Sequence, residues 1–190
     1  MQAHAKPSAR DRLLAAADEL FYREGVNTVG IDRVIEHAGV AKATLYSAFG
    51  SKDELVAAYL QHRLGTRKRR IDAKLAGIAD PRERILRIYD ALGDAMRDNN
   101  YRGCAFARAR AESRPGTAVT QACDASRAWL RDLFRGLVAE LDVADPDRLA
   151  HQLVLLYDGV TNSSLLDGDP ETAAAARAAA TTLVDAAERR

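Results

Sequence analysis

The stretch between Gly30 and Phe49 constrains the fold of this chain more than any other part of it. Its first half places apolar side chains three, four and seven residues apart, as on one face of a short helix: Ile31, Val34, Ile35 and Ala38. Gly39 follows where a helix needs a left-handed residue to stop it. A second helix from about Ala41 would place Ala41, Leu45 and Phe49 four residues apart, so that they share its inner face. The stretch therefore predicts a helix-turn-helix motif at residues 30–49.

The outer face of the second predicted helix carries small, polar, cationic and phenolic side chains: Lys42, Ala43, Thr44, Tyr46 and Ser47. A recognition helix enters the major groove of DNA by its N-terminal residues. Ala43 allows close approach, and Thr44 offers a hydroxyl to a base edge or a methyl group to thymine. Lys42 and Tyr46 can reach phosphates, which determines affinity and register rather than sequence preference. This face is expected to contact double-stranded DNA.

A further helix start follows the motif directly. Ser51 and Glu54 have the spacing of a capping box, which places Lys52 in the first helical turn. A lysine and free backbone amides at a helix start make a seat for one phosphate. The full set of predicted DNA-contacting residues is Gly30, Arg33, Lys42, Ala43, Thr44, Tyr46, Ser47 and Lys52.

From Ser8 to about Arg67 the chain resembles the DNA-binding domain of TetR/AcrR-type transcriptional regulators. The residues that carry the likeness are Phe21, Gly25, Ala38-Gly39-Val40, Thr44-Leu45-Tyr46, Phe49, Ser51-Lys52 and Leu55. The chain departs from the family pattern at Gly30, where Ser or Thr is usual, and at Ala48, where many relatives have His. The resemblance implies a DNA-binding domain at 8–67 and an effector-binding and dimerisation domain at 68–190.

Composition favours an all-α fold of this size. The 190 residues are rich in helix formers, and aromatic residues make up only 6% of them. No apolar run has the length of a membrane span, and the N-terminus lacks the apolar core of a signal peptide, so we expect a cytoplasmic protein without membrane association. The net charge is only +1, so binding to DNA depends on where the charges point, and a dimer is expected to be needed for useful affinity.

Helix boundaries in the second half are marked by Asp-Pro pairs. Asp80-Pro81, Asp145-Pro146 and Asp169-Pro170 each combine an N-cap acceptor with a proline suited to the first helical position. With a break at Arg114-Pro115-Gly116, these pairs predict helices near 81–98, 101–113, 117–141, 146–165 and 170–188. Together with the N-terminal helix after Ser8, the motif and the helix after Ser51, the prediction is about nine helices.

Aromatic and soft side chains gather on the predicted helices between residues 81 and 141: Tyr89, Met96, Cys104, Phe106, Cys123 and Trp129. The resemblance implies a ligand cavity among these helices, whereas composition alone favours an ordinary core. The two cysteines have no CxxC spacing and no neighbouring histidine, which favours core side chains over a thiol redox switch. The histidines are scattered without ligand spacing, so we expect no metal and no cofactor.

The last two predicted helices carry apolar and small side chains at helical spacing: Leu153, Leu156, Val160, Ala176, Ala180 and Leu183. Two such helices from each subunit can form a four-helix dimer interface, as the resemblance also implies. The alternative is a core stripe within one chain. Asp158 interrupts the apolar run, and we expect it to pair at the dimer interface.

The resemblance implies a homodimeric repressor that a small-molecule effector releases from a palindromic operator. Two alternatives stay open at this point. One is a DNA-binding regulator or activator that needs no effector. The other is an enzyme on an all-α scaffold, but no Ser/His/Asp, Cys/His, paired-carboxylate or phosphate-loop arrangement supports it, so we expect a non-enzyme.

Overall fold

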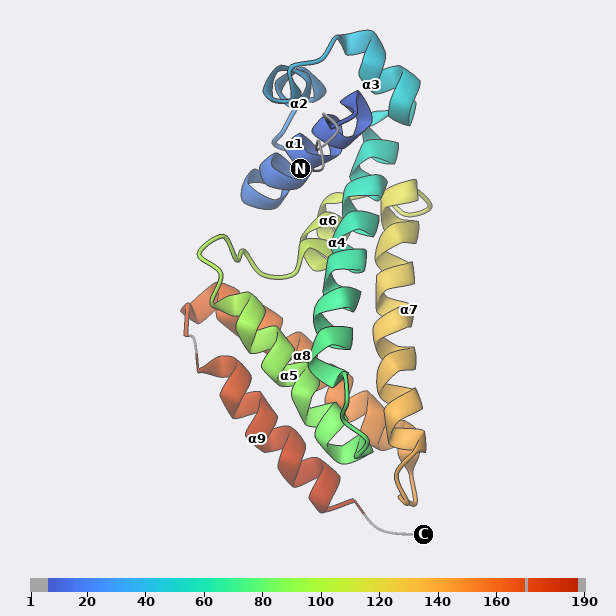
Figure 1. Ribbon diagram of the computed structural model, residues 1–190, viewed down its shortest axis with the longest axis vertical. Coiled ribbons are helices and arrows are strands. Elements are labelled where there is room, and N and C mark those ends of the chain that lie inside the picture. Colours follow the sequence, from blue (N-terminus) through green and yellow to red (C-terminus); the bar gives the residue numbers. More distant parts are fainter. Residues whose placement is uncertain (1–6, 170, 188–190) are drawn as a thin grey trace, which may run out of the picture. The chain divides into compact units, whose positions relative to one another are not determined.

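The computed structural model describes residues 7–169 and 171–187 (Figure 1). Within these ranges it contains helices and no strand, which confirms the all-α prediction. The helices are α1 (Ala9–Glu24), α2 (Ile31–Ala38), α3 (Lys42–Phe49), α4 (Lys52–Leu75), α5 (Pro81–Met96), α6 (Ala105–Glu112), α7 (Ala118–Ala139), α8 (Pro146–Asp167) and α9 (Thr172–Asp185). None of the described helices is both long enough and apolar enough to cross a membrane.

Two of the three Asp-Pro pairs begin helices as predicted. Asp80 accepts the backbone N–H of Arg82 at 3.1 Å, and Asp145 accepts that of Arg148 at 3.0 Å. The last helix begins at Thr172, later than expected, and Pro170 lies outside the described residues. α6 begins four residues after the predicted start at 101, because the chain turns at Gly103 with a left-handed φ of 75°.

Contacts divide the chain into two compact units. The first unit contains the described residues up to Leu64 together with Ala105–Asp124, and the second unit contains Gly65–Cys104 and the residues from Ala125 onward. The sequence predicts a single boundary near residue 67. The structure instead returns the chain to the first unit with α6 and the start of α7, a non-local pairing that no local sequence pattern reports.

The first unit is built on α1, against which α2 and α3 pack. Isolated helices of eight residues, such as α2 and α3, are not stable in water, so their order depends on this packing. Phe21 of α1 meets Tyr59 of α4 edge to face, with ring centroids 5.7 Å apart. Arg63 adds an ion pair to Asp18 at 2.6 Å.

The second unit has an apolar core to which α5, α7, α8 and α9 contribute. α9 runs antiparallel to α5, since Arg82 at the start of α5 forms an ion pair at 2.6 Å with Asp185 at the end of α9 (Figure 1). At the other end a Cβ on Gly93 would lie 3.2 Å from the Cβ of Ala173, so glycine lets the two helices approach closely. The hydroxyl of Tyr89 donates to the carbonyl of Leu153 at 2.7 Å, which satisfies a buried polar group inside this core.

Candidate DNA-binding site

The turn of the predicted helix-turn-helix is closed by backbone hydrogen bonds. Gly39 adopts a left-handed φ of 62°, and its N–H donates to the carbonyl of Glu36 at 3.1 Å. The N–H of Val40 donates to the carbonyl of Ile35 at 3.3 Å, so two carbonyls at the end of α2 are satisfied. Leu45 on the inner face of α3 is fully buried. The predicted motif and its turn are confirmed.

The outer face of α3 is open to solvent. Lys42, Ala43, Tyr46 and Ser47 are exposed, and Thr44 is half-buried. Tyr46 is 46% exposed, which leaves its ring and hydroxyl accessible to a partner. Among the residues that the structure describes, no side chain caps the N-terminus of α3, so its first amide groups stay available to an anion.

The start of α4 lies directly after α3. Ser51 Oγ accepts the backbone N–H of Glu54 at 3.1 Å, which is one half of the predicted capping box. Lys52 is the first residue of α4 and is half-buried. Within the part of the chain that the structure describes, no carboxylate forms an ion pair with Lys52. Its charge therefore stands at a helix N-terminus that also favours anions.

Two of the predicted DNA-contacting cations are already paired with carboxylates of the same chain. Lys42 Nζ lies 2.9 Å from Asp32 Oδ1, and this hydrogen bond raises the pKa of Lys42. Arg33 Nη2 donates to Glu24 Oε1 at 2.9 Å. These pairs reduce the positive charge that the motif offers to phosphates. Sequence reasoning missed them because the partners lie nine and ten residues apart, on different helices.

Two arginines of α1 lie beside the helix-turn-helix, although the spacing of apolar residues in the sequence did not predict them there. The guanidinium carbon of Arg10 lies 4.8 Å from the ring centroid of Phe49 at the end of α3. Arg12 Nε donates to the carbonyl of Ala38 at 3.2 Å, at the end of α2. Arg12 thus secures the turn, and the exposed Arg10 adds a cation beside α3. The sequence signal that could have indicated them is the presence of two basic side chains near the start of α1.

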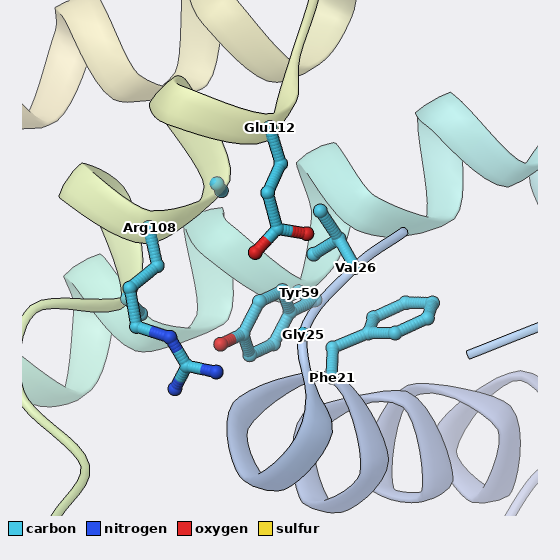
Figure 2. Close-up of a pocket in the computed structure, with 8 residues that line it drawn as sticks. Phe21, Gly25, Val26, Tyr59, Arg108 and Glu112 are labelled. Carbon is cyan, nitrogen blue, oxygen red and sulfur yellow. The ribbon is translucent and has the colours of Figure 1, made fainter. Parts of the chain in front are cut away.

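α6 contacts the end of α1 and the loop that leads to α2 (Figure 2). Arg108 Nη1 donates to the carbonyl of Tyr22 at 2.8 Å, and Glu112 Oε2 accepts the backbone N–H of Asn27 at 2.9 Å. Gly25, with φ 99°, lies so close that a Cβ there would sit 3.2 Å from Glu112 Oε1. The cavity between these elements holds only about 10 Å³, too little for a ligand beyond a single water. These contacts hold the end of α1 and the following loop against α6, and they leave no space for a binding pocket.

The six residues predicted to line a ligand pocket fall into both units. Phe106 and Cys123 belong to the first unit, where the thiol of Cys123 donates to the carbonyl of Phe106 at 3.4 Å. The other four, which belong to the second unit, are Tyr89, Met96, Cys104 and Trp129.

Within the second unit these four side chains differ in their surroundings. Tyr89 is fully buried, and this burial raises the pKa of its hydroxyl. Met96 and Trp129 are half-buried at the edge of the core. Cys104 Sγ lies 3.9 Å from the guanidinium of Arg67. Tyr89 therefore has the surroundings of a core residue, whereas the other three keep some exposure.

The structure also places the residues predicted for a dimer interface. The core of the second unit buries four of them: Leu153, Val160, Ala176 and Ala180. Leu156 and Leu183 are partly buried against the same core. Asp158, expected to pair at a dimer interface, forms an ion pair with Arg127 of α7 in the same chain. The outward face of α8 carries Leu155 and Leu166, which are 55% and 82% exposed.

Known proteins share both the motif and the whole fold. The family model described as "Bacterial regulatory proteins, tetR family" matches residues 13–59. SCO4454, a TetR-family transcriptional regulator from Streptomyces coelicolor, has a crystal structure that matches 95% of this chain and 96% of its own, with 32% identity and a TM-score of 0.88.

Two further similarities are narrower in what they show. An uncharacterized HTH-type transcriptional regulator from Mycobacterium tuberculosis is 34% identical over 91 residues, which is 48% of this chain and only 45% of that regulator. A transcriptional regulator from Saccharomonospora viridis, solved in complex with choline, matches 95% of this chain and 98% of its own at 22% identity and a TM-score of 0.77, which shows the fold alone. Because SCO4454 is similar over nearly its full length, this chain belongs to the TetR family of bacterial transcriptional regulators.

Proposed function

We propose that this chain is a homodimeric repressor that binds a palindromic DNA operator and is released from it by a small-molecule effector. The observation that carries the DNA-binding part is the exposed polar face of α3 on a buried apolar support. In this proposal Ala43 and Thr44 meet base edges in the major groove. Tyr46, Ser47 and Lys52 contact phosphates and fix the register.

The charge balance of the first unit supports a dimer. Arg33 and Lys42 each share their charge with a carboxylate, so one helix-turn-helix makes few uncompensated phosphate contacts. Affinity for DNA rises with the number of neutralised phosphates, and two motifs double that number while reading two half-sites. The exposed Leu155 and Leu166 of α8 supply an apolar surface on which a second copy can pack. The interface that we propose uses this outward face, since the inward face is occupied by the core.

The effector part of the proposal is supported by the second unit and by a protein of the same fold. Half-buried Met96, Cys104 and Trp129 give the edge of the core soft and aromatic groups suited to an apolar ligand. The Saccharomonospora viridis regulator binds choline. An effector must bind the DNA-free state more tightly, and a coupling of about 1–3 kcal/mol would release DNA measurably.

Sedimentation velocity tests the dimer. We expect the wild-type chain to sediment at twice its 20.7 kDa mass and the Leu166→Asp variant to sediment as a monomer. Ala107→Asp, which places the same charge on an exposed position of α6, should leave the dimer intact. A monomeric wild-type chain, or equal dissociation of both variants, would refute the proposed interface.

In vitro transcription from the promoter of its own gene tests the sign of regulation. A repressor lowers transcript yield as protein is added, and an effector found by thermal-shift screening restores it. An increase in transcript would favour the activator alternative. Repression that no thermally stabilising compound relieves would favour an effector-independent regulator.

A further inference from the structure

A groove of about 330 Å³ lies between α7 and α8 in the second unit. One wall is formed by Arg127, Arg131 and Arg135 of α7, and the other carries Asp147 and His151 of α8. The buried apolar side chains of Ala150 and Val154 on α8 also line the groove. The volume is in the range of small-ligand sites, about 300–1,000 Å³.

The three arginines repeat every four residues and therefore share one face of α7. Eight residues of helix rise about 12 Å, so the guanidinium groups form a row along the groove. An anion with a single charged group meets only part of such a row. A ligand with two or more oxyanion groups can contact several arginines at once.

The outer two arginines are held by carboxylates of α8, and the middle one is not. Arg127 forms an ion pair with half-buried Asp158, and Arg135 Nε lies 3.5 Å from the exposed Asp147 Oδ1. Among the described residues, no carboxylate forms an ion pair with the exposed Arg131. A guanidinium has five N–H donors, so the two held arginines keep donors beyond those that their carboxylates use.

We propose that this groove binds a small molecule that carries at least two phosphate or carboxylate groups, with Arg131 as its main anchor. Guanidinium groups bind both kinds of oxyanion through paired hydrogen bonds. Asp158 and Asp147 each neutralise one of the outer arginines, so the groove keeps one uncompensated positive charge among the described residues, at Arg131. None of these residues belongs to the predicted effector pocket, the DNA-contacting face or the exposed leucines of α8, so the inference does not rest on the proposed function.

Isothermal titration calorimetry of the full chain with inorganic pyrophosphate and, separately, with citrate tests the site. The two probes distinguish a phosphate ligand from a carboxylate ligand at matched ionic strength. We expect at least one of them to bind with a dissociation constant of about 0.1 mM or tighter. Acetate, with one charged group, should bind at least about ten-fold more weakly because it engages a single guanidinium. Absence of heat from both polyanions at millimolar concentration would overturn the proposal.

Two variants with the same change in net charge separate a built site from general attraction. Arg131→Gln should weaken binding of the preferred probe by at least about ten-fold, as expected for loss of a charge-assisted contact. Arg148→Gln removes an exposed arginine of α8 that does not line the groove, and should change affinity by less than about two-fold. If both variants weakened binding of the probe equally, the binding would reflect general electrostatic attraction, and the proposed site would be refuted. Thermal melting of both variants confirms that each remains folded.

Discussion

The two units of this protein differ in where their predicted functional residues lie. In the first unit the side chains predicted to act, such as Tyr46 and Lys42, stand on the surface of a short helix whose inner face is buried. In the second unit the residues singled out by pattern, such as Tyr89 and Leu153, fill the core of their own chain.

The contrast has a physical origin. A surface that reads DNA must present particular groups at fixed spacing, because the partner has a fixed groove and a regular backbone. The interior of a helical unit only needs apolar side chains that fill the available volume, so many sequences satisfy it. A sequence motif can therefore identify the first kind of surface, whereas a ligand cavity has no comparable pattern.

The substitution with the largest expected effect destabilises the core of the second unit and changes no residue of the first. Phe134 is fully buried between Tyr89 and Tyr157, with ring centroids 6.1 and 6.3 Å away. Phe134→Ala should lower the free energy of unfolding by about 3–5 kcal/mol, because it removes buried area and leaves a cavity. Urea denaturation followed by circular dichroism measures it. Tyr46→Ala, at an exposed ring, should cost less than about 0.5 kcal/mol. Similar losses for both would remove the distinction between core and surface.

Thr44→Val sharpens the comparison by changing specificity at a site that bears little on stability. The substitution keeps the shape of the side chain and removes the hydroxyl, so any hydrogen bond to a base edge is lost. We expect a change in discrimination at one base pair of each half-site worth about 1–3 kcal/mol. Selection from a library of random duplexes reports it. An unchanged consensus sequence would mean that Thr44 does not read a base.

Lys52→Ala should weaken binding to all DNA sequences alike, by about ten-fold at low salt, because a phosphate contact carries no sequence information. The slope of log affinity against log salt should fall by about one. Fluorescence anisotropy at several salt concentrations measures both quantities. Lys74→Ala, which removes a lysine of the same helix that pairs with Asp94, is the matched control and should leave the slope unchanged. A slope unaffected by Lys52→Ala would exclude its phosphate contact.

The smallest expected effect is a gain. Asp32→Asn removes the carboxylate that holds Lys42 and deletes one negative charge beside the recognition helix. We expect DNA affinity to rise by about two- to five-fold, the size of an exposed ion pair, with a steeper salt dependence. Fluorescence anisotropy titrations of this variant and of the wild type with DNA measure the change in affinity. Weaker binding would show that the ion pair positions Lys42 instead of competing with DNA for it.

Sequence reasoning succeeded where one residue type determines a local conformation. Gly39 at the turn and the aspartates Asp80 and Asp145 at helix starts lie where the pattern placed them. It failed where the partner is distant in sequence. The hydrogen bond of Asn27 to Glu112 and the pairing of Asp158 with Arg127 join residues 85 and 31 positions apart. No periodicity reports such contacts.

The dimer residues illustrate a different limit. The spacing of Leu153, Leu156 and Val160 correctly indicates an apolar face of α8, but periodicity does not say whether that face meets the same chain or a second one. In the structure Leu153 and Val160 are buried in the core of their own chain, and Leu156 is partly buried against it. The exposure of Leu166 on the same helix can be inferred only once it is known which face of α8 points inward.

The most direct test of the account is selection of binding sites from random DNA, followed by anisotropy on the enriched duplex and on a shuffled version of it. If α3 is a recognition helix in a dimer, the enriched sequence is a palindrome whose half-sites lie about one helical turn apart or a multiple of it. The shuffled duplex should then bind at least about a thousand-fold more weakly. No enrichment, with equal and steeply salt-dependent binding to both duplexes, would contradict the account and leave only attraction to phosphates.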